Sequence, residues 1–294
     1  MYPVMLRTFT HILRDEYGLR SAQQVDVYEQ VGIIRLIRPN PNYNNGKWHH
    51  VLNLTQHPLF ENCIGVIDGM HVKAILPRDE RVNFIGSKGI STQNVLVACD
   101  FNLCFTFVHA GWMGTTHDSL MLARAIHSPK IDFPKSAPGK YYLVDSGFVH
   151  RPGYMVPYKG LDILYHFQQF YDGQTGARRN FCNAHERFNF RHSSCRNVIE
   201  CAFGVWKSGW KILDRMPSYN FKVLTAVVLA TMGIHNFLRR AGVVEKAFTR
   251  AETDPDAAEV ELPDEQEQAA AEFNAPEMQR NERDRFRDYL AQRH

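Results

Sequence analysis

The 294-residue sequence lacks the features that mark several specialised classes of protein. Its six cysteines form no CxxC pair and have no regular spacing, so we expect neither a disulfide framework nor a zinc knuckle. Its fourteen histidines form no HExxH motif or equivalent ligand pair, which argues against a zinc enzyme. No apolar run approaches the length of a membrane span, and the N-terminus has no signal-peptide core. We therefore expect an intracellular protein with reduced thiols and no membrane association.

Acidic and basic side chains are unevenly distributed along the chain. Residues 245–278 hold eleven acidic and two basic side chains, although the whole chain has a net charge of +3. The last sixteen residues carry five arginines and three acidic side chains. Residues 1–244 therefore have a net charge of about +10. A basic body of this kind fits a protein that binds a polyanion. The acidic segment either screens the basic surface or is a solvated linker, and we favour the linker.

Local patterns divide the chain into three parts. Residues 1–46 predict a truncated helical segment, with two short helices that end in a Pro- and Asn-rich stretch, and this is too little to fold as a domain. Residues 47–244 carry the strand and helix patterns of the main domain. Residues 245–294 predict an acidic, largely disordered tail that closes with a short helix at 280–290.

The main domain has a recognisable order of elements. We expect strands at 64–76, 93–100, 105–110 and 141–144, with helices at 119–127, 196–213 and 221–240 and an irregular region at 149–195. Three strands, a helix and a further strand, then an inserted region and a helix, are the order of an RNase H-like fold. This is an α/β fold with a mixed sheet and flanking helices. In such a sheet the first and fourth strands can be neighbours.

Two buried strands lead into an aspartate that is followed within two residues by glycine. A turn-starting Asp-Gly would explain Asp68 alone, but Asp145 stands at the matching place on the fourth strand. If these strands are neighbours, the two carboxylates lie side by side, and a helix nearby can add Glu200. Three close carboxylates repel one another unless cations neutralise them, and oxygen ligands suit Mg²⁺ or Mn²⁺. Two such ions would support an in-line phosphodiester displacement.

Several other residues compete for roles in this site. Asp118 is a lower-ranked candidate for the second carboxylate, since it opens a helix and can be explained as a cap. His117 either supports a metal ligand or is a hydrogen-bonded core histidine. Lys207 is either functional or an exposed helical lysine. Trp206 and Trp210 are more readily explained as packing groups than as platforms for stacked bases.

Five motifs carry a family resemblance that covers roughly residues 55–242. They are IGVIDGMH (64–71), QNVLVACDFNLCFTFVHAGWMGTTHDS (93–119), YYLVDSGFVHRPGYMVPYKG (141–160), RNVIECAFGVWKSGWKIL (196–213) and MGIHNFLRR (232–240). The chain resembles transposases of the PIF/Harbinger superfamily, or host nucleases derived from them, and most of all the plant-type members. The resemblance implies a DDE superfamily endonuclease domain that cuts DNA with two Mg²⁺ or Mn²⁺ ions. The implied catalytic and metal-binding triad is Asp68, Asp145 and Glu200.

The resemblance also implies how the chain contacts DNA and which partners it has. The spacing of Arg196, Glu200 and Lys207 resembles a motif whose basic groups bind DNA phosphate, although Ser193 stands where that motif has Tyr and Cys201 where many relatives have Arg. A Myb-like partner protein and action in the nucleus, with the cytoplasm as a second location, are implied, and a homo-oligomer is an open alternative. The family's helix-turn-helix-like stretch has no counterpart before residue 37. This favours the rival hypothesis of a catalytically idle scaffold in a DNA- or chromatin-associated complex.

Overall fold

A computed structural model describes the greater part of the main domain and the C-terminal helix. The described residues are 36–39, 60–76, 84, 91–160, 163–173, 175–242 and 277–292, with side chains in the last segment from residue 284. The two helices expected within residues 1–46 lie outside the described residues, as does nearly all of the acidic segment.

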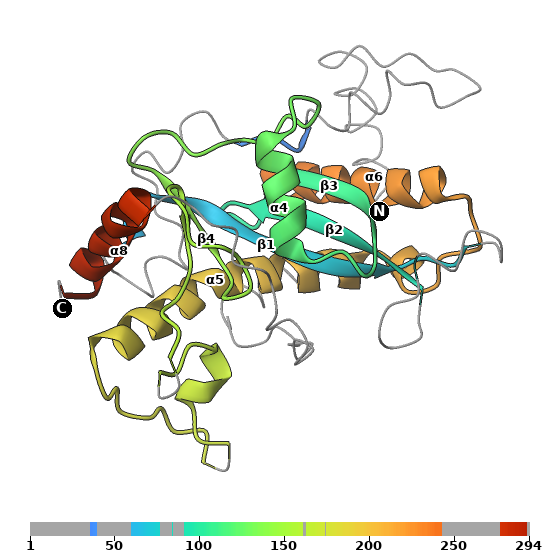
Figure 1. The fold of residues 1–294 in the computed structure, drawn as a ribbon. Coiled ribbons are helices and arrows are strands. Elements are labelled where there is room, and N and C mark those ends of the chain that lie inside the picture. Colours follow the sequence, from blue (N-terminus) through green and yellow to red (C-terminus); the bar gives the residue numbers. More distant parts are fainter. Residues whose placement is uncertain are drawn as a thin grey trace.

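The centre of the structure is a five-stranded mixed sheet (Figure 1). Its strands, in the spatial order β3-β2-β1-β4-β5, are β1 (Cys63–Lys73), β2 (Thr92–Cys99), β3 (Phe105–Met113), β4 (Tyr141–Val144) and β5 (Tyr154–Met155). The first three strands pair antiparallel, whereas β4 runs parallel to β1 and β5 parallel to β4. The first and fourth strands are therefore neighbours, as the order of elements predicted.

Helices cover both faces of the sheet because strand residues alternate between them. Val66 and Met70 of β1 belong to the core that contains α5 (Ala184–Gly209) and α6 (Phe221–Arg240). Ile67 belongs to the second core, together with α4 (Asp118–His127) on the opposite face. The three-layer arrangement is visible in Figure 1, where α4 crosses one face while α5 and α6 lie behind the other. Every even-numbered β1 residue from Val66 to Met70 thus faces α5.

The largest difference from the predicted elements is the start of α5. This helix begins at Ala184, twelve residues before the predicted start, so the prediction of an irregular stretch up to residue 195 is wrong there. The Asn183 side chain accepts a hydrogen bond from the Glu186 amide and caps the helix. Phe188 and His192 then bury one helical face. Polar and aromatic residues alternate closely in this stretch, which hides the helical period in the sequence.

The helix α6 has the predicted bounds and packs as a core helix. By length and composition alone this 20-residue helix could cross a membrane. Its buried face instead packs against β3, and the fully buried Asn236 side chain ties the two elements together. Asn236 Nδ2 donates to the carbonyls of Leu36 and Phe105, at 2.9 and 2.6 Å, and its Oδ1 accepts from the Phe105 amide at 2.7 Å.

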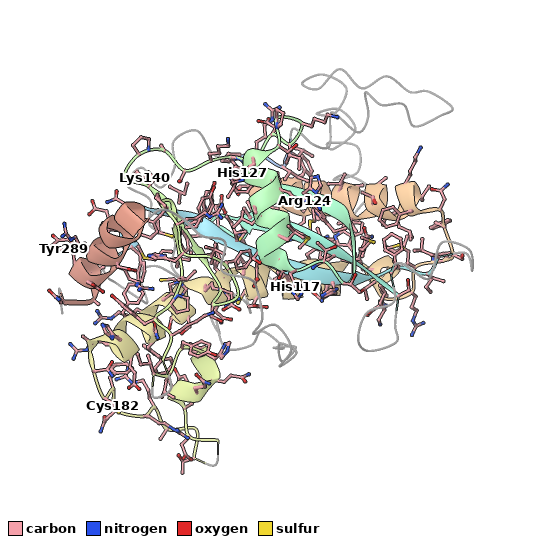
Figure 2. The ribbon with its side chains drawn as sticks, viewed as in Figure 1. His117, Arg124, His127, Lys140, Cys182 and Tyr289 are labelled. Atoms are coloured by element: carbon pink, nitrogen blue, oxygen red, sulfur yellow. The ribbon has the colours of Figure 1, made fainter. Side chains whose placement is uncertain are left out.

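The C-terminal helix α8 (Glu277–Gln292) packs on the edge of the domain that holds β4 and α5 (Figure 1). Leu290 is buried there, the Arg287 guanidinium lies 4.0 Å from the Tyr158 ring centroid, and the Tyr158 hydroxyl donates to Asp288 at 2.7 Å. Figure 2 shows Tyr289 of this helix on the outside of the molecule, and Cys182 in the segment before α5. None of the six cysteines forms a disulfide, and only Cys182 is exposed.

Candidate metal centre

The register of β1 and β4 places two predicted carboxylates side by side. The parallel pairing ends with Ile67 opposite Val144, so the next residues on the two strands are Asp68 and Asp145. Alternation along each strand turns both side chains to the face that α5 covers. Asp68 lies within β1 rather than at its end, since β1 continues beyond it and Asp68 still pairs with β2. This agrees with the predicted strand at 64–76, and an opening forms because β4 stops while β1 continues.

The helix α5 supplies a cation and the third carboxylate. Arg196 Nη2 lies 2.6 Å from Asp68 Oδ2 and 3.5 Å from Glu200 Oε1, and Arg196 Nη1 lies 3.0 Å from Asp145 Oδ1. The Arg196 side chain is only 16% exposed. Arg196 and Glu200 are four residues apart and so lie on one face of the helix. The structure thus brings the three predicted carboxylates around a single guanidinium.

A fourth carboxylate approaches the same opening from the other face of the sheet. His117 occupies the N-cap position of α4, so Asp118 is the first helical residue and not the cap. The buried Asn94 side chain on β2 donates from Nδ2 to Asp118 Oδ1 at 2.8 Å. A Cβ on Gly69 would overlap the Asp118 carboxyl group, so the carboxylate lies where only glycine leaves room.

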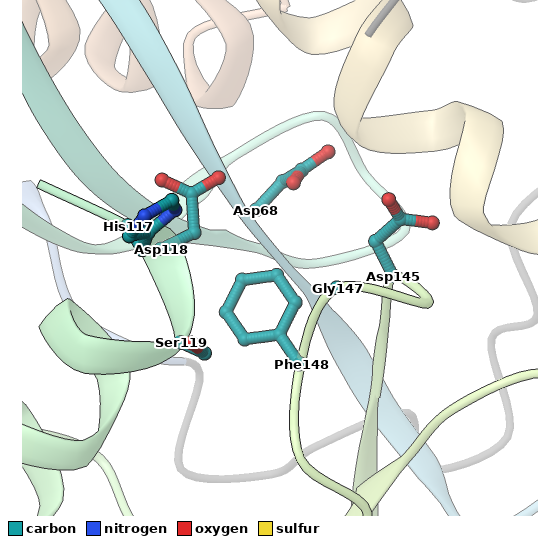
Figure 3. A pocket seen from close by; sticks show the side chains of 7 residues that line it. All are labelled: Asp68, His117, Asp118, Ser119, Asp145, Gly147 and Phe148. Carbon is teal, nitrogen blue, oxygen red and sulfur yellow. The ribbon is translucent and has the colours of Figure 1, made fainter. Parts of the chain in front are cut away.

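These groups line one small pocket (Figure 3). Figure 3 shows Asp118 and Asp145 on either side of Asp68, with the Phe148 ring below them and His117 beside Asp118. The pocket has about 30 Å³ of room for water-sized occupants. That is enough for water or a metal ion and far too little for a nucleotide. Ser119 and Gly147 complete the lining.

Negative charge exceeds positive charge at this site. Burial raises the pKa of Asp68 well above its usual value; the neighbouring carboxylates add to this effect, and Arg196 opposes it. Burial also acts to raise the pKa of Asp145, but Arg196 outweighs it, and that pKa lies below its usual value. Burial works against the charge of Arg196, yet Asp145 and the other carboxylates raise its pKa. One guanidinium therefore pairs with three carboxylates, and Asp118 is a fourth carboxylate close enough for its charge to act on Asp68.

The donor chemistry suits a hard divalent cation, but the side chains do not converge on one as they stand. Carboxylate oxygens are the ligands that Mg²⁺ and Mn²⁺ prefer. Within the ranges that the structure describes, no three Asp, Glu, His or Cys side chains are placed to hold a single ion. The reason is visible in the ion pairs, since the guanidinium of Arg196 lies between the carboxylates. The carboxylates therefore suit a divalent cation chemically, and they can bind one when the Arg196 guanidinium moves out from between them.

The other predicted site residues lie farther away or in the core. Lys207 is exposed in the last turn of α5, two turns and about 10 Å along the helix from Glu200. Cys201 is buried in the core on the sheet side of α5, and Ser193 Oγ donates to the Phe190 carbonyl. Trp206 is fully buried and donates from Nε1 to Thr231 Oγ1, which bears out the packing interpretation.

Three residues of the site escaped the sequence analysis. Asn94 and Gly69 position Asp118, and a polar side chain in the apolar run of β2 was a usable signal for Asn94. His166 lies close enough to Asp145 and Arg196 for their charges to act on it, although burial dominates and lowers the pKa of His166. Nothing in the local sequence of His166 indicates this placement, because it comes from the loop before α5.

Comparison with known proteins matches residues 67–236 to the family described as DDE superfamily endonuclease. The chain belongs to this family. The matched range contains Asp68, Asp145, Arg196 and Glu200, so the whole carboxylate centre lies inside the DDE endonuclease domain. The C-terminal helix α8 lies beyond it.

Curated relatives of this DDE superfamily member are named "Putative nuclease HARBI1". The protein from Bos taurus is 26% identical over 183 residues, which are 61% of this chain and 47% of the relative. The Homo sapiens protein is 25% identical over 183 residues, with the same two shares, and the Mus musculus protein is 26% identical over 178 residues, 59% of this chain and 45% of the relative. The chain spans about half the length of these relatives. No solved structure gives a significant match.

Proposed function

We propose that this protein is a divalent-metal-dependent DNA endonuclease of the DDE transposase type, hydrolysing or transferring DNA phosphodiesters. The observation that carries the proposal is the convergence of Asp68, Asp145 and Glu200 from three separate elements around one buried cation. Three carboxylates share one guanidinium here, so the carboxylates of this network outnumber its cations. An excess of buried negative charge favours cation binding.

In this proposal each residue has a defined task. Asp68, Asp145 and Glu200 hold two Mg²⁺ or Mn²⁺ ions, with Asp118 as a further candidate ligand. Ions bound there would supply positive charge to the attacking and leaving oxygens of an in-line phosphodiester displacement. Lys207 and Arg196 contact substrate phosphate, which orients the scissile strand along α5.

The substrate is proposed to be DNA rather than a small phosphate ester. The pocket is too small to enclose a nucleotide, so the substrate must lie across the surface and present one phosphate to the carboxylates. Residues 1–244 carry about +10 charges, which suits a polyanion lying across the domain. We expect DNA affinity to fall steeply with salt.

The biological setting is also a proposal. The five motifs that resemble PIF/Harbinger transposases, and the match to relatives named as nucleases, favour a transposase-derived enzyme of this type, with the plant-type members as the nearest resemblance. We propose that it acts in the nucleus with a Myb-like DNA-binding partner. Homo-oligomerisation is compatible with this setting.

A catalytically idle scaffold in a DNA- or chromatin-associated complex is the second candidate. The observation that favours it is Arg196, which already neutralises part of the carboxylate cluster from within the chain. In a scaffold these ion pairs would serve the fold alone, and metal would have no effect on it.

Nicking of plasmid DNA in Mg²⁺ or Mn²⁺ separates the two candidates. Asp68→Asn, Asp145→Asn and Glu200→Gln should each slow cutting by roughly 10²–10³-fold, because each removes a charge from the reaction centre. Asp118→Asn should slow it less. Asp214→Asn is the matched control, since Asp214 pairs with Lys73 and its side chain is 79% exposed.

The pattern of losses decides between the assignments. Cutting that is dead in Asp118→Asn and intact in Asp145→Asn would make Asp118 the second ligand. Absence of metal-dependent cutting in the wild type, with a Myb-like partner added and the fold verified by circular dichroism, would favour the scaffold.

A further inference from the structure

We propose that Arg196 is an internal counter-ion that holds the place of the metal, and that it leaves the carboxylates when divalent ions bind. The inference rests on the proposed function, and it adds a step that precedes cutting. Arg196 is therefore a positioning residue that controls metal loading of the centre.

The contacts of Arg196 match those expected of a metal substitute. Its two terminal nitrogens share three carboxylates, with Asp68 nearest at 2.6 Å, then Asp145 at 3.0 Å and Glu200 at 3.5 Å. The three acceptors come from β1, from the end of β4 and from α5 itself. A planar, always-charged guanidinium can span acceptors from separate elements in this way, which a lysine ammonium does less well.

The guanidinium and the metal ions compete for the same carboxylates. Asp68 Oδ2 and Asp145 Oδ1 already accept hydrogen bonds from Arg196, and these are the strand carboxylates that a metal would have to bind. A divalent ion bound to these carboxylates would repel a guanidinium at such distances, and it would withdraw the negative charge that holds Arg196. Metal binding therefore weakens the Arg196 ion pairs.

Arg196 is also incompletely bonded where it lies. Its Nε is buried and makes no hydrogen bond within the described part of the structure, and an unpaired buried donor is costly. The carboxylates hold the side chain by charge, while its full hydrogen-bonding capacity is unused. Loss of those charges to a metal would leave little to keep the guanidinium in place.

Displacement gives the released side chain a second task. Arg196 and Lys207 are eleven residues apart, close to three full helical turns, and so they lie on the same face of α5. A guanidinium that swings away from the carboxylates remains on this face and can pair with a substrate phosphate. One arginine would then stabilise the metal-free centre and grip DNA in the loaded one.

The experiment measures Mn²⁺ binding without DNA, by electron paramagnetic resonance of the free ion, for the full chain at neutral pH. Arg196→Met should bind Mn²⁺ at least tenfold more tightly than the wild type, and Arg196→Lys should lie between them. Arg191→Met is the matched control, because it removes the same charge from the same helix five residues away. Its Mn²⁺ affinity should stay within about twofold of the wild type.

A second readout is the melting temperature with and without Mn²⁺. Metal-free Arg196→Met should melt below the wild type because its carboxylates repel one another, and Mn²⁺ should raise its melting temperature more than it raises that of the wild type. If Arg196→Met does not fold without metal, Arg196→Lys carries the comparison.

The outcomes separate this inference from the proposed function. Equal or weaker Mn²⁺ binding by both Arg196 variants, with binding abolished in Asp145→Asn, would overturn the counter-ion role and leave the metal centre intact. An equal gain in Mn²⁺ affinity in Arg191→Met and Arg196→Met would show that the effect comes from net charge alone, and it would also overturn the counter-ion role. Absence of Mn²⁺ binding in every variant, Arg196→Met included, would instead overturn the metal centre itself.

Discussion

Two buried histidines act as neutral hydrogen-bond donors to backbone carbonyls in the main domain. His192 Nε2 lies 3.0 Å from the Met155 carbonyl, one helical turn before Arg196, and His235 Nε2 lies 2.7 Å from the Leu103 carbonyl. Burial lowers the pKa of each to about 4. Protonation would place a positive charge in the core, where burial disfavours it, so these residues link folding to pH.

Their effect on stability has a definite direction. A histidine with a pKa of about 4 in the folded protein and about 6.5 when unfolded binds its proton preferentially in the unfolded chain. The contribution of the neutral histidines to the free energy of unfolding is therefore complete above pH 6.5. It is lost as the pH falls toward 4, by on the order of 2 kcal/mol per histidine at pH 5. Urea unfolding at pH 7 and pH 5 measures this loss. His235→Gln, which keeps a donor for the Leu103 carbonyl, should lose about half of the difference, and an unchanged difference would contradict the assignment.

At the scale of elements, the site is made by the place where one strand stops and its neighbour continues. The end of β4 leaves an opening beside β1 that Asp68 and Asp145 reach from the α5 face and Asp118 from the α4 face. Gly69 lies in this opening, and its missing side chain is what admits the Asp118 carboxylate.

Gly69→Ala tests that packing directly. The new methyl group would meet the movable end of Asp118 and not backbone, so we expect a change in stability below about 1 kcal/mol. Asp118 would lose its place beside Asn94, and cutting should slow at least as much as in Asp118→Asn. The double variant should be no slower than the more affected single variant, because both changes act on one side chain. Gly173→Ala, where an added Cβ meets no atom within 4 Å, is the control, and equal cutting by both glycine variants would refute this role.

The same elements show how far the sequence could predict the fold and the site. Apolar runs and their order predicted the pairing of β1 with β4, and with it the juxtaposition of Asp68 and Asp145. The start of α5 could not be predicted, because burial of Phe188 and His192 depends on tertiary contacts and not on a local period. The ion pairs of Arg196 were missed for a related reason, since a motif gives a residue's spacing but not the direction of its side chain.

At the scale of the whole molecule, Asn236 joins segments that are distant in sequence. Its side chain bonds Leu36 and Phe105, which are 200 and 131 residues away. The motif around it contributed to the family resemblance, but these contacts are structural. Asn236 attaches α6 and the segment at residue 36 to the β3 edge of the sheet.

Asn236→Leu should therefore destabilise the fold without touching the site. The substitution conserves volume but leaves the Phe105 amide and two carbonyls buried without a partner, at a cost of about 3 kcal/mol. Thermal unfolding measures this loss, and Mn²⁺ affinity at temperatures where the variant is folded should equal that of the wild type. The control is Asn102→Ala, at an exposed position in the turn between β2 and β3, and it should leave the melting temperature unchanged. A variant with wild-type stability would contradict the role of Asn236.

The distribution of the carboxylates along the chain also orders events during protein synthesis. Asp68 and Asp145 leave the ribosome first, while the cation that lets them coexist and the third carboxylate follow together, one helical turn apart on α5. A translation product that stops before this helix contains Asp68 and Asp145 but neither Arg196 nor Glu200. Under the proposed function, such a truncated or still-nascent chain cannot cut DNA, and the capacity to cut arises only when α5 has been made and has packed on the sheet.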